Sequence, residues 1–311
     1  MIVEPHVPVM LNEVIAGLKI KAGGIYIDAT FGRGGHTKAI LAKLGNYGRV
    51  IVIDKDPEAI AIAKKLSEQD RRVSVYHGSY ANILEFCQIE NIIGSVNGII
   101  LDLGVSSPQL DQANRGFSFS KDGPLDMRMD PSKGRSAGEW LQQAQEKEIY
   151  RVLKIYGEER YARRIARAIC QVRQGQPITT TKNLSDLIMN VYPKKHELNK
   201  HPATRSFQAI RIFINNELEE LKKVLGPIVE ILAPNGRLVV VSFHSLEDRI
   251  VKRFIHEQAK GDTFPYKLPV QAKQLKPSLK KIGKLQKPEH REILQNARAR
   301  SAVLRIAEKL E

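Results

Sequence analysis

Residues 26–37 read Tyr26-Ile27-Asp28-Ala29-Thr30-Phe31-Gly32-Arg33-Gly34-Gly35-His36-Thr37, an apolar run that ends in an acid and breaks into a glycine-rich turn. A second apolar run, 39–44, follows at once and is rich in helix-favouring residues. Glycines permit a positive φ and a close approach of ligand to backbone, and the first N–H groups of a helix are free to bind that ligand. The pattern predicts a strand, a tight turn and a helix that hold a nucleotide-like ligand.

The residues around this turn indicate the ligand class. The dinucleotide fingerprint needs a third glycine where Thr37 stands, which disfavours an NAD oxidoreductase. Acids instead end the first strand, at Asp28, and the second, at Asp54. Because S-adenosylmethionine carries a zwitterionic amino acid, a positive sulfonium and a ribose diol, carboxylates on both sides of the turn suit it better than they suit a diphosphate. The alternative is that these acids only cap helices and the glycines only make turns.

Apolar runs in the first third of the chain alternate with helical patterns. The runs cover residues 25–28, 50–54, 72–77 and 99–102. This alternation predicts an α/β fold with a parallel, doubly wound sheet, whose ligands bind at the carboxyl ends of the strands. Four polar residues stand at or just after these ends: Asp28, Asp54, Tyr80 and Asp102. We therefore expect the site at this edge of the sheet.

After residue 102 the alternation stops and returns only near the C-terminus. A polar loop spans about 104–130, and helical patterns follow at 138–146, 148–155, 158–173 and 184–191. A long amphipathic helix over 207–225 and strands at 237–241 and 301–307 then resume the sheet. We predict a sheet domain formed by residues 1–110 and 204–311, interrupted by an inserted all-helical domain at 111–203.

Charge and composition limit the class of protein. The 311 residues carry a net charge of +15, which indicates a polyanionic partner. No run of about 18 apolar residues is present, and the two isolated cysteines have no metal-ligand spacing. We expect no membrane span, no metal and a cytoplasmic location. Basic residues gather in 273–309, and we expect the part before Pro288 to be mobile.

Five motifs follow one another along the chain: Asp28-Ala-Thr-Phe-Gly-Arg-Gly-Gly-His36, Leu101-Asp-Leu-Gly-Val-Ser-Ser-Pro-Gln109, Arg115-Gly-Phe-Ser-Phe119, Leu125-Asp-Met-Arg-Met129 and Ser242-Phe-His-Ser-Leu-Glu-Asp248. Together they closely resemble the RsmH (MraW) family over nearly the whole chain. Its members are bacterial methyltransferases that modify N4 of a cytidine, cytidine 1402, in the decoding centre of 16S ribosomal RNA.

The resemblance implies a Rossmann-like class I S-adenosylmethionine-dependent methyltransferase fold with the helical insert. It also implies S-adenosylmethionine as cofactor and 16S ribosomal RNA in the small (30S) subunit as partner. A monomer and a homodimer both stay open. With Asp28 from the residue pattern, the expected cofactor contacts are Asp28, Gly34, Gly35, His36, Asp54, Tyr80, Asp102 and Gln109. Tyr80 stands where phenylalanine is common in the family, so an aromatic ring is kept.

The residues after the fourth strand bear on the proton acceptor. Many DNA amino-methyltransferases carry Asp/Asn/Ser-Pro-Pro-aromatic after strand four, whereas this chain has Asp102-Leu103-Gly104-Val105. Our hypothesis is that Asp102 accepts from the cytosine amine. Further candidates for a catalytic role are Ser106, Ser107 and His244. For His244, a local role at the end of a strand stays open as well.

Several patterns keep two interpretations. Four arginines share one face of the 158–173 helix and form either a solvated surface or a phosphate contact: Arg160, Arg163, Arg164 and Arg167. Three aromatic residues either stack on an RNA base or pack in a core: Phe117, Phe119 and Trp140.

Two rival functions remain, a DNA cytosine-N4 methyltransferase and a non-catalytic RNA-binding assembly factor. The missing Pro-Pro motif argues against the first, and the intact acids count against the second.

Overall fold

The structure is a computed structural model that describes residues 8–193, 201–261 and 276–311. The chain divides into two compact units, Met1–Gly104 with Leu218–Glu311 and Val105–Glu217. The expected insert, 111–203, falls inside the second unit, whose limits lie further out on both sides. Among the described residues, none of the helices combines the length and the apolar character needed to cross a membrane.

The first unit contains a seven-stranded sheet of the order β3-β2-β1-β4-β5-β7-β6. Its strands are β1 (Ile25–Asp28), β2 (Arg49–Asp54), β3 (Val73–His77), β4 (Val96–Asp102), β5 (Leu232–Ser242), β6 (Leu279–Gln286) and β7 (Val303–Lys309). Its helical segments are α1 (Leu11–Leu18), α2 (Gly35–Leu41), α3 (Pro57–Gln69), η1 (Tyr80–Asn82), α4 (Ile83–Ile89), α11 (Glu217–Ile231), α12 (Ser245–Lys260), α13 (His290–Gln295) and η4 (Ala297–Ser301).

The direction of the strands confirms the expected α/β fold and adds one feature. Strands β1 to β5 pair in parallel, as the alternation of strands and helices predicts. Strand β7 pairs antiparallel with both β5 and β6. Parallel neighbours need a crossover connection, whereas antiparallel strands do not. The reversed β7 fills the gap between β5 and β6 and leaves the carboxyl ends of β1, β2 and β4 together at one edge.

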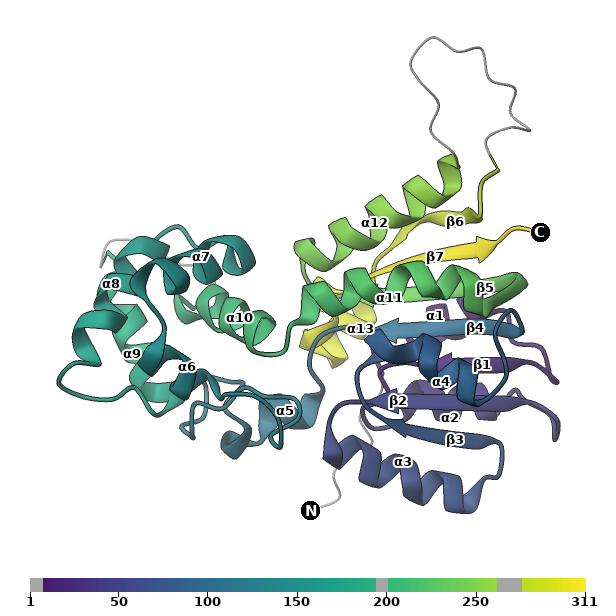
Figure 1. Cartoon of the computed structure of the whole chain (residues 1–311), viewed down its shortest axis with the longest axis horizontal. Helices are drawn as coiled ribbons and strands as arrows, with labels where there is room; N and C mark the ends of the chain where they lie inside the picture. Colours follow the sequence, from purple (N-terminus) through teal and green to yellow (C-terminus); the bar gives the residue numbers. More distant parts are fainter. Residues whose placement is uncertain (1–7, 194–200, 262–275) are drawn as a thin grey trace, which may run out of the picture. The chain divides into compact units, whose positions relative to one another are not determined.

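Helices cover both faces of the sheet (Figure 1). Side chains alternate along each strand, so that Ile99 and Leu101 of β4 join the core under α4, α11 and α12. Ile100, between them, joins the core under α1, α2 and α3. Residues 99–102 are apolar up to the final acid because both faces of the strand are buried, as in other parallel sheets.

The second unit is helical in its described part. Its elements are α5 (Ser107–Asp111), η2 (Ala113–Arg115), α6 (Ala137–Gln143), α7 (Glu146–Gly157), α8 (Ala162–Val172), α9 (Thr181–Val191) and α10 (Ala203–Ile214). Trp140 lies in its core, only 2% exposed, and its Nε1 donates to Glu148 Oε1 at 2.8 Å. Phe117 is buried, and Phe119 stacks on His201 with ring centroids 4.4 Å apart. For Trp140 and Phe117 the packing interpretation therefore holds.

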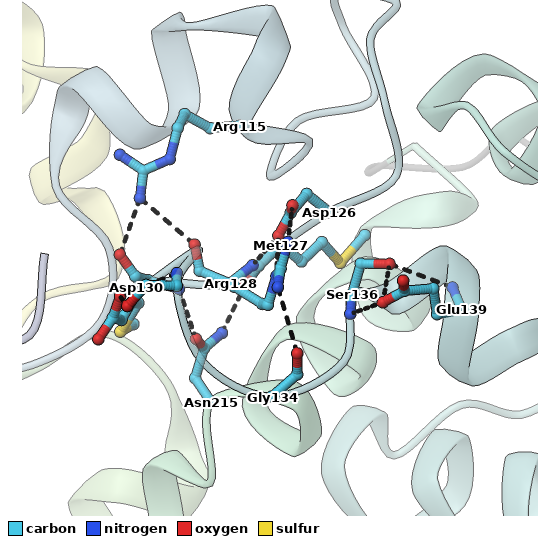
Figure 2. Close-up of polar contacts among 11 residues, drawn as sticks. Arg115, Asp126, Met127, Arg128, Asp130, Gly134, Ser136, Glu139 and Asn215 are labelled. Atoms are coloured by element: carbon cyan, nitrogen blue, oxygen red, sulfur yellow. Dashed lines mark hydrogen bonds and ion pairs between the residues drawn. The ribbon is translucent and has the colours of Figure 1, made fainter.

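The polar loop before α6 is held by specific contacts within this unit (Figure 2). Arg115 is buried, and its Nη2 donates to the carbonyl oxygens of Arg128 (3.3 Å) and Met129 (2.9 Å). Asn215 accepts from the Met129 amide at 2.7 Å and donates to the Met127 carbonyl at 2.7 Å. These side chains satisfy backbone groups that a loop without ladder hydrogen bonds would leave unpaired when buried.

Two sequence expectations are wrong. The single helix expected over 207–225 is two helices, because α10 ends at Ile214 and α11 begins at Glu217. Asn216 between them has φ +54, a left-handed conformation that asparagine tolerates better than most residues. The segment before Pro288, expected to be mobile, contains β6, which pairs with β7. Residues 273–275 of that segment lie outside the described residues.

Candidate cofactor and active site

Three acids stand at one edge of the first unit's sheet. Strands β1, β2 and β4 end at Asp28, Asp54 and Asp102. The register sets Asp28 beside Val52 of β2 and Ile100 of β4, so each acid lies within about two residues of its neighbour along the strands. The edge predicted from the sequence is therefore the place where parallel α/β sheets bind their ligands.

The turn after β1 needs glycine for two separate reasons. Gly32 and Gly34 have φ +56 and +76, in the left-handed region that side chains disfavour. A Cβ on Gly34 would also lie 2.7 Å from the Phe31 ring. Gly34 is the N-cap of α2, and Gly35 is the first residue of that helix. The turn thus brings backbone without side chains to the edge where the acids stand, with open space beside Gly32, while Phe31 and Pro8 pack against Gly34 and Gly35.

Asp28 is fully buried and is held by hydroxyl and amide groups of the turn. Thr37 Oγ1 donates to Asp28 Oδ2 at 2.6 Å, and the Thr30 amide donates to Oδ1 at 3.3 Å. Burial raises the pKa of the Asp28 carboxyl, although His36 and the bond from Thr37 act in the opposite direction. The threonine at the place of the third fingerprint glycine therefore binds a carboxylate. Sequence reasoning missed this role, which a hydroxyl so close to an acid could have signalled.

Asp54 holds the glycine turn from the second strand. Its Oδ2 accepts from the Gly32 amide at 2.7 Å, and its Oδ1 accepts from the Asp56 amide at 2.8 Å. Burial raises the pKa of Asp54 to about 6, the Asp56 and Asp28 charges add to this rise, and the two amide bonds oppose it. Each carboxylate oxygen has a second lone pair, so Asp54 can still accept from the hydroxyls of a ligand.

Asp102 lies beside a buried histidine. His36 is 5% exposed, and its Nε2 lies 3.4 Å from Asp102 Oδ2, within ion-pair distance. Burial by itself lowers the pKa of His36, but the Asp102 and Asp28 carboxylates outweigh it, and the pKa lies above its ordinary value. The Asp102 amide donates to Thr30 Oγ1 at 2.7 Å, which fixes the end of β4 to the turn. Strands β1 and β4 are therefore joined by side chains as well as by their ladder.

Polar atoms of this pair are left for a ligand. Asp102 Oδ1 and His36 Nδ1 are buried and have no hydrogen-bond partner among the described residues. Orphaned buried polar atoms are rare in native proteins, and each needs an explanation. The orphaned Asp102 Oδ1 and the buried Asp28 suit a ligand with hydrogen-bond donors and a positive charge. They fit the amino acid and ribose parts of S-adenosylmethionine and do not fit a diphosphate.

The other predicted site residues lie in several places. Tyr80 begins η1 after β3 and packs, half-buried, against the core under α4. Ser106, Ser107 and Gln109 belong to the second unit at α5, where the Ser106 amide donates to Gln109 Oε1 at 2.9 Å. These residues remain predictions as ligand contacts.

His244 has the local role that the sequence left open. It is the N-cap of α12, its Nδ1 accepts from the Glu247 amide at 3.4 Å, and its Nε2 lies 3.1 Å from Glu247 Oε1. The capping box of α12 therefore runs from His244 to Glu247. A catalytic role of His244 remains a prediction.

Comparison with known proteins agrees with this geometry. A model of the MraW methylase family matches residues 3–310. Proteins named ribosomal RNA small subunit methyltransferase H from two strains of Coxiella burnetii, RSA 331 / Henzerling II and RSA 493 / Nine Mile phase I, are each 54% identical over 307 residues, covering 99% of both chains. An rRNA methylase structure from Streptococcus thermophilus is 11% identical with a TM-score of 0.43, and the match covers 97% of this chain and 94% of that one. Because the family model spans nearly the whole chain and relatives of equal extent share more than half of its residues, the chain belongs to the MraW methylase family.

Proposed function

We propose that the chain transfers a methyl group from S-adenosylmethionine to N4 of a cytidine in the decoding centre of 16S ribosomal RNA, within the small ribosomal subunit in the cytoplasm. The observation that carries the proposal is the Asp102–His36 pair with its buried, orphaned atoms, beside the glycine turn. Membership of a methylase family and relatives named for the small-subunit ribosomal RNA support the same reaction.

The residues of the sheet edge divide the work of holding the cofactor. The turn backbone at Gly34 and Gly35 approaches the amino acid end, where Asp28 supplies negative charge. Asp54 accepts from the ribose hydroxyls, since carboxylates at the end of the second strand bind such diols in related folds. Tyr80 and Gln109 are proposed as contacts of the adenine side. When bound, S-adenosylmethionine supplies a strongly electrophilic methyl group.

Asp102 is the proposed acceptor for the nucleophile. The cytosine N4 amine is a weak nucleophile because its lone pair is delocalised into the ring. A carboxylate that accepts a hydrogen bond from the amine orients that lone pair, and holding the reactants in line can supply on the order of 7–11 kcal/mol. The nitrogen becomes acidic once methylated, so Asp102 can also take its proton. His36, 3.4 Å from Asp102 Oδ2, holds the carboxylate in position.

Cofactor affinity is expected to fall in acid because of Asp54. Its pKa of about 6 lies above the ordinary value, so the carboxylate is ionised at pH 7.5 and largely protonated at pH 5. Only the ionised form accepts from both ribose hydroxyls, so affinity for S-adenosylmethionine should drop by about tenfold between pH 7 and pH 5. Calorimetry at the two pH values measures this. Asp54→Asn should bind more weakly at pH 7 and lose most of the pH dependence.

Protonation of Asp54 has the opposite effect on folding stability: it lowers cofactor affinity but stabilises the folded protein. Since the folded pKa of Asp54 is raised above the unfolded value of 3.8, the folded state binds the proton more tightly. The ionisation of this group therefore costs stability above about pH 6, and its contribution improves as the pH falls from 6 towards 4. Between pH 6 and pH 4, protonation of Asp54 should therefore weaken cofactor binding without destabilising the folded protein. Equal pH dependence in wild type and Asp54→Asn would contradict the assignment.

One experiment tests the reaction and the substrate together. The protein is incubated with S-adenosylmethionine and small ribosomal subunits that lack this modification, and the RNA is digested to nucleosides for mass spectrometry. The expected result is a new N4-methylcytidine signal that is absent with Asp102→Asn. Methylation of DNA but not of the subunits would favour the DNA methyltransferase alternative. Cofactor binding without any methylated product would favour a non-catalytic RNA-binding role.

A further inference from the structure

Four arginines and two tyrosines form a surface on the second unit that we call the arginine–tyrosine face. Its members are Arg160, Arg163, Arg164, Arg167, Tyr150 and Tyr161. All four arginines are exposed. None of them makes a hydrogen bond or an ion pair with a residue that the structure describes, whereas many other arginines of the chain, Arg128 for example, are paired with a carboxylate. The face therefore carries four uncompensated charges.

Tyrosine rings hold three of these four guanidinium groups in place. Arg163 lies over the ring of Tyr150, 5.6 Å from its centroid. Arg160 and Arg164 lie over Tyr161 at 5.6 and 5.7 Å. A cation above an aromatic face keeps its charge and its N–H donors available while its side-chain motion is reduced. The heads of Arg160, Arg163 and Arg164 are thus arranged before any partner binds.

The ring beneath two of the arginines is itself anchored. Tyr161 meets Tyr192 edge to face, with centroids 4.7 Å apart. The Tyr192 hydroxyl donates to both oxygens of Glu159, at 2.7 and 2.8 Å, and the Tyr161 amide donates to Glu159 Oε1 at 2.9 Å. Glu159 is completely buried, so its charge serves this internal network and does not cover the arginines.

The arginines on the exposed side of α8 repel one another. Like charges four residues apart repel each other on a helix, as Arg163 and Arg167 do on α8 (Ala162–Val172), whereas Arg160 lies just before the helix, which starts later than the 158–173 pattern predicts. The helix is held by its opposite side, where Ile165 and Ile169 are fully buried. A bound polyanion would neutralise these charges and remove their mutual repulsion. A membrane surface is disfavoured because an interfacial helix inserts its apolar face into lipid, and the apolar face of α8 is already in the core.

We propose that the arginine–tyrosine face binds the phosphodiester backbone of the RNA that carries the target cytidine, without reading its base sequence. Planar guanidinium groups match phosphate oxygens, and the tyrosine rings beneath them keep these groups in place for the backbone. The identity of this RNA rests on the proposed function. Val172 at the end of α8 is 45% exposed and is not part of the arginine–tyrosine face.

The salt dependence of RNA affinity tests this proposal. The probe is a labelled single-stranded oligonucleotide of the decoding-centre sequence, with a scrambled oligonucleotide of equal length. Each phosphate contact on a single strand contributes about −0.7 to the slope of log affinity against log salt. Arg163→Gln with Arg167→Gln should reduce the slope by about 1.4 and weaken binding at 0.1 M salt by about 25-fold for both oligonucleotides.

Two controls separate this face from general charge effects. Arg163→Lys with Arg167→Lys retains the charge, so the slope should stay near that of wild type. Lys182→Gln removes an exposed charge of the same unit that is already paired with Asp186 at 2.9 Å, and should leave the slope unchanged. An unchanged slope in the double glutamine variant would overturn the proposal. An equal reduction of the slope in Lys182→Gln would also overturn it. The same holds if the glutamine variant loses binding to anionic lipid vesicles but binds RNA as wild type does.

The readout is independent of methyl transfer. If the double glutamine variant shows the expected change in slope but the wild-type protein forms no N4-methylcytidine, the proposed reaction is overturned and this RNA-binding surface is retained. A protein that methylates the subunits while the glutamine variant binds RNA as wild type does would overturn this surface and retain the reaction.

Discussion

Replacing Asp102 by asparagine is expected to lower the single-turnover rate of methyl transfer by roughly 100-fold or more, the usual scale for removing a positioned acceptor of a proton. The variant keeps the shape of the side chain and removes its charge, so the amine loses its proton acceptor and His36 loses its partner at 3.4 Å. Rapid-quench measurement of N4-methylcytidine with enzyme in excess over subunits reports the chemical step without product release.

A matched control distinguishes the site from a general loss of an acid. Asp186→Asn makes the same chemical change on an exposed aspartate of α9, whose side chain is 54% exposed. Its single-turnover rate should equal that of wild type. If Asp102→Asn also reacts at the wild-type rate under saturating cofactor, Asp102 is not the acceptor, and Ser106, Ser107 and His244 become the candidates to test.

Replacing Gly116 by alanine is expected to destabilise the second unit by about 3 kcal/mol or more, a large effect for one methyl group. Gly116 has φ +70, a left-handed conformation that costs other residues about 1–2 kcal/mol. The added Cβ would also lie 2.3 Å from the Pro124 carbonyl oxygen and 2.6 Å from the Asp126 nitrogen. Both neighbours are backbone atoms of the loop that Arg115 and Asn215 hold, so relief requires that loop to move.

Gly134→Ala provides a control with the same backbone angle. Gly134 also has φ +70, but no atom lies within 4 Å of the position of a new Cβ (its carbonyl group is drawn in Figure 2). This variant should lose only about 1–2 kcal/mol, from the conformation itself. Thermal unfolding of the two variants in parallel measures the difference. Equal shifts in the unfolding midpoint would show that the contact with Pro124 and Asp126 does not limit this turn.

Much of the first unit could be predicted because its signals are local. The expected strand at 25–28 matches β1, and the expected strand at 50–54 differs from β2 by one residue. Apolar runs, glycines that need positive φ and Pro57 at the start of α3 act within a few residues. The acids at the strand ends could be predicted as well, because parallel strands bring their carboxyl ends to one edge whatever the loops between them do.

The second unit and the tail were harder to predict from local pattern. The apolar spacing of 207–225 continues through Asn215 and Asn216, and the break between α10 and α11 depends on contacts of Asn215 with Met127 and Met129, more than 80 residues away along the chain. Strand β6 has exposed lysines and little alternation, and becomes ordered through its pairing with β7. A short window of sequence contains neither the partners of Asn215 nor the partner strand of β6.

The sequence by itself determined the order of elements, the glycine turn and the edge of the sheet at which the acids stand, since each of these follows from backbone preferences and apolar periodicity over a few residues. Only the tertiary structure decided that Thr37 binds Asp28, that Asp54 holds Gly32, and that His36 lies beside Asp102. The physical reason is that side-chain hydrogen bonds and buried charges depend on distances of a few ångströms between different strands and turns, and those distances are set by packing of the whole core.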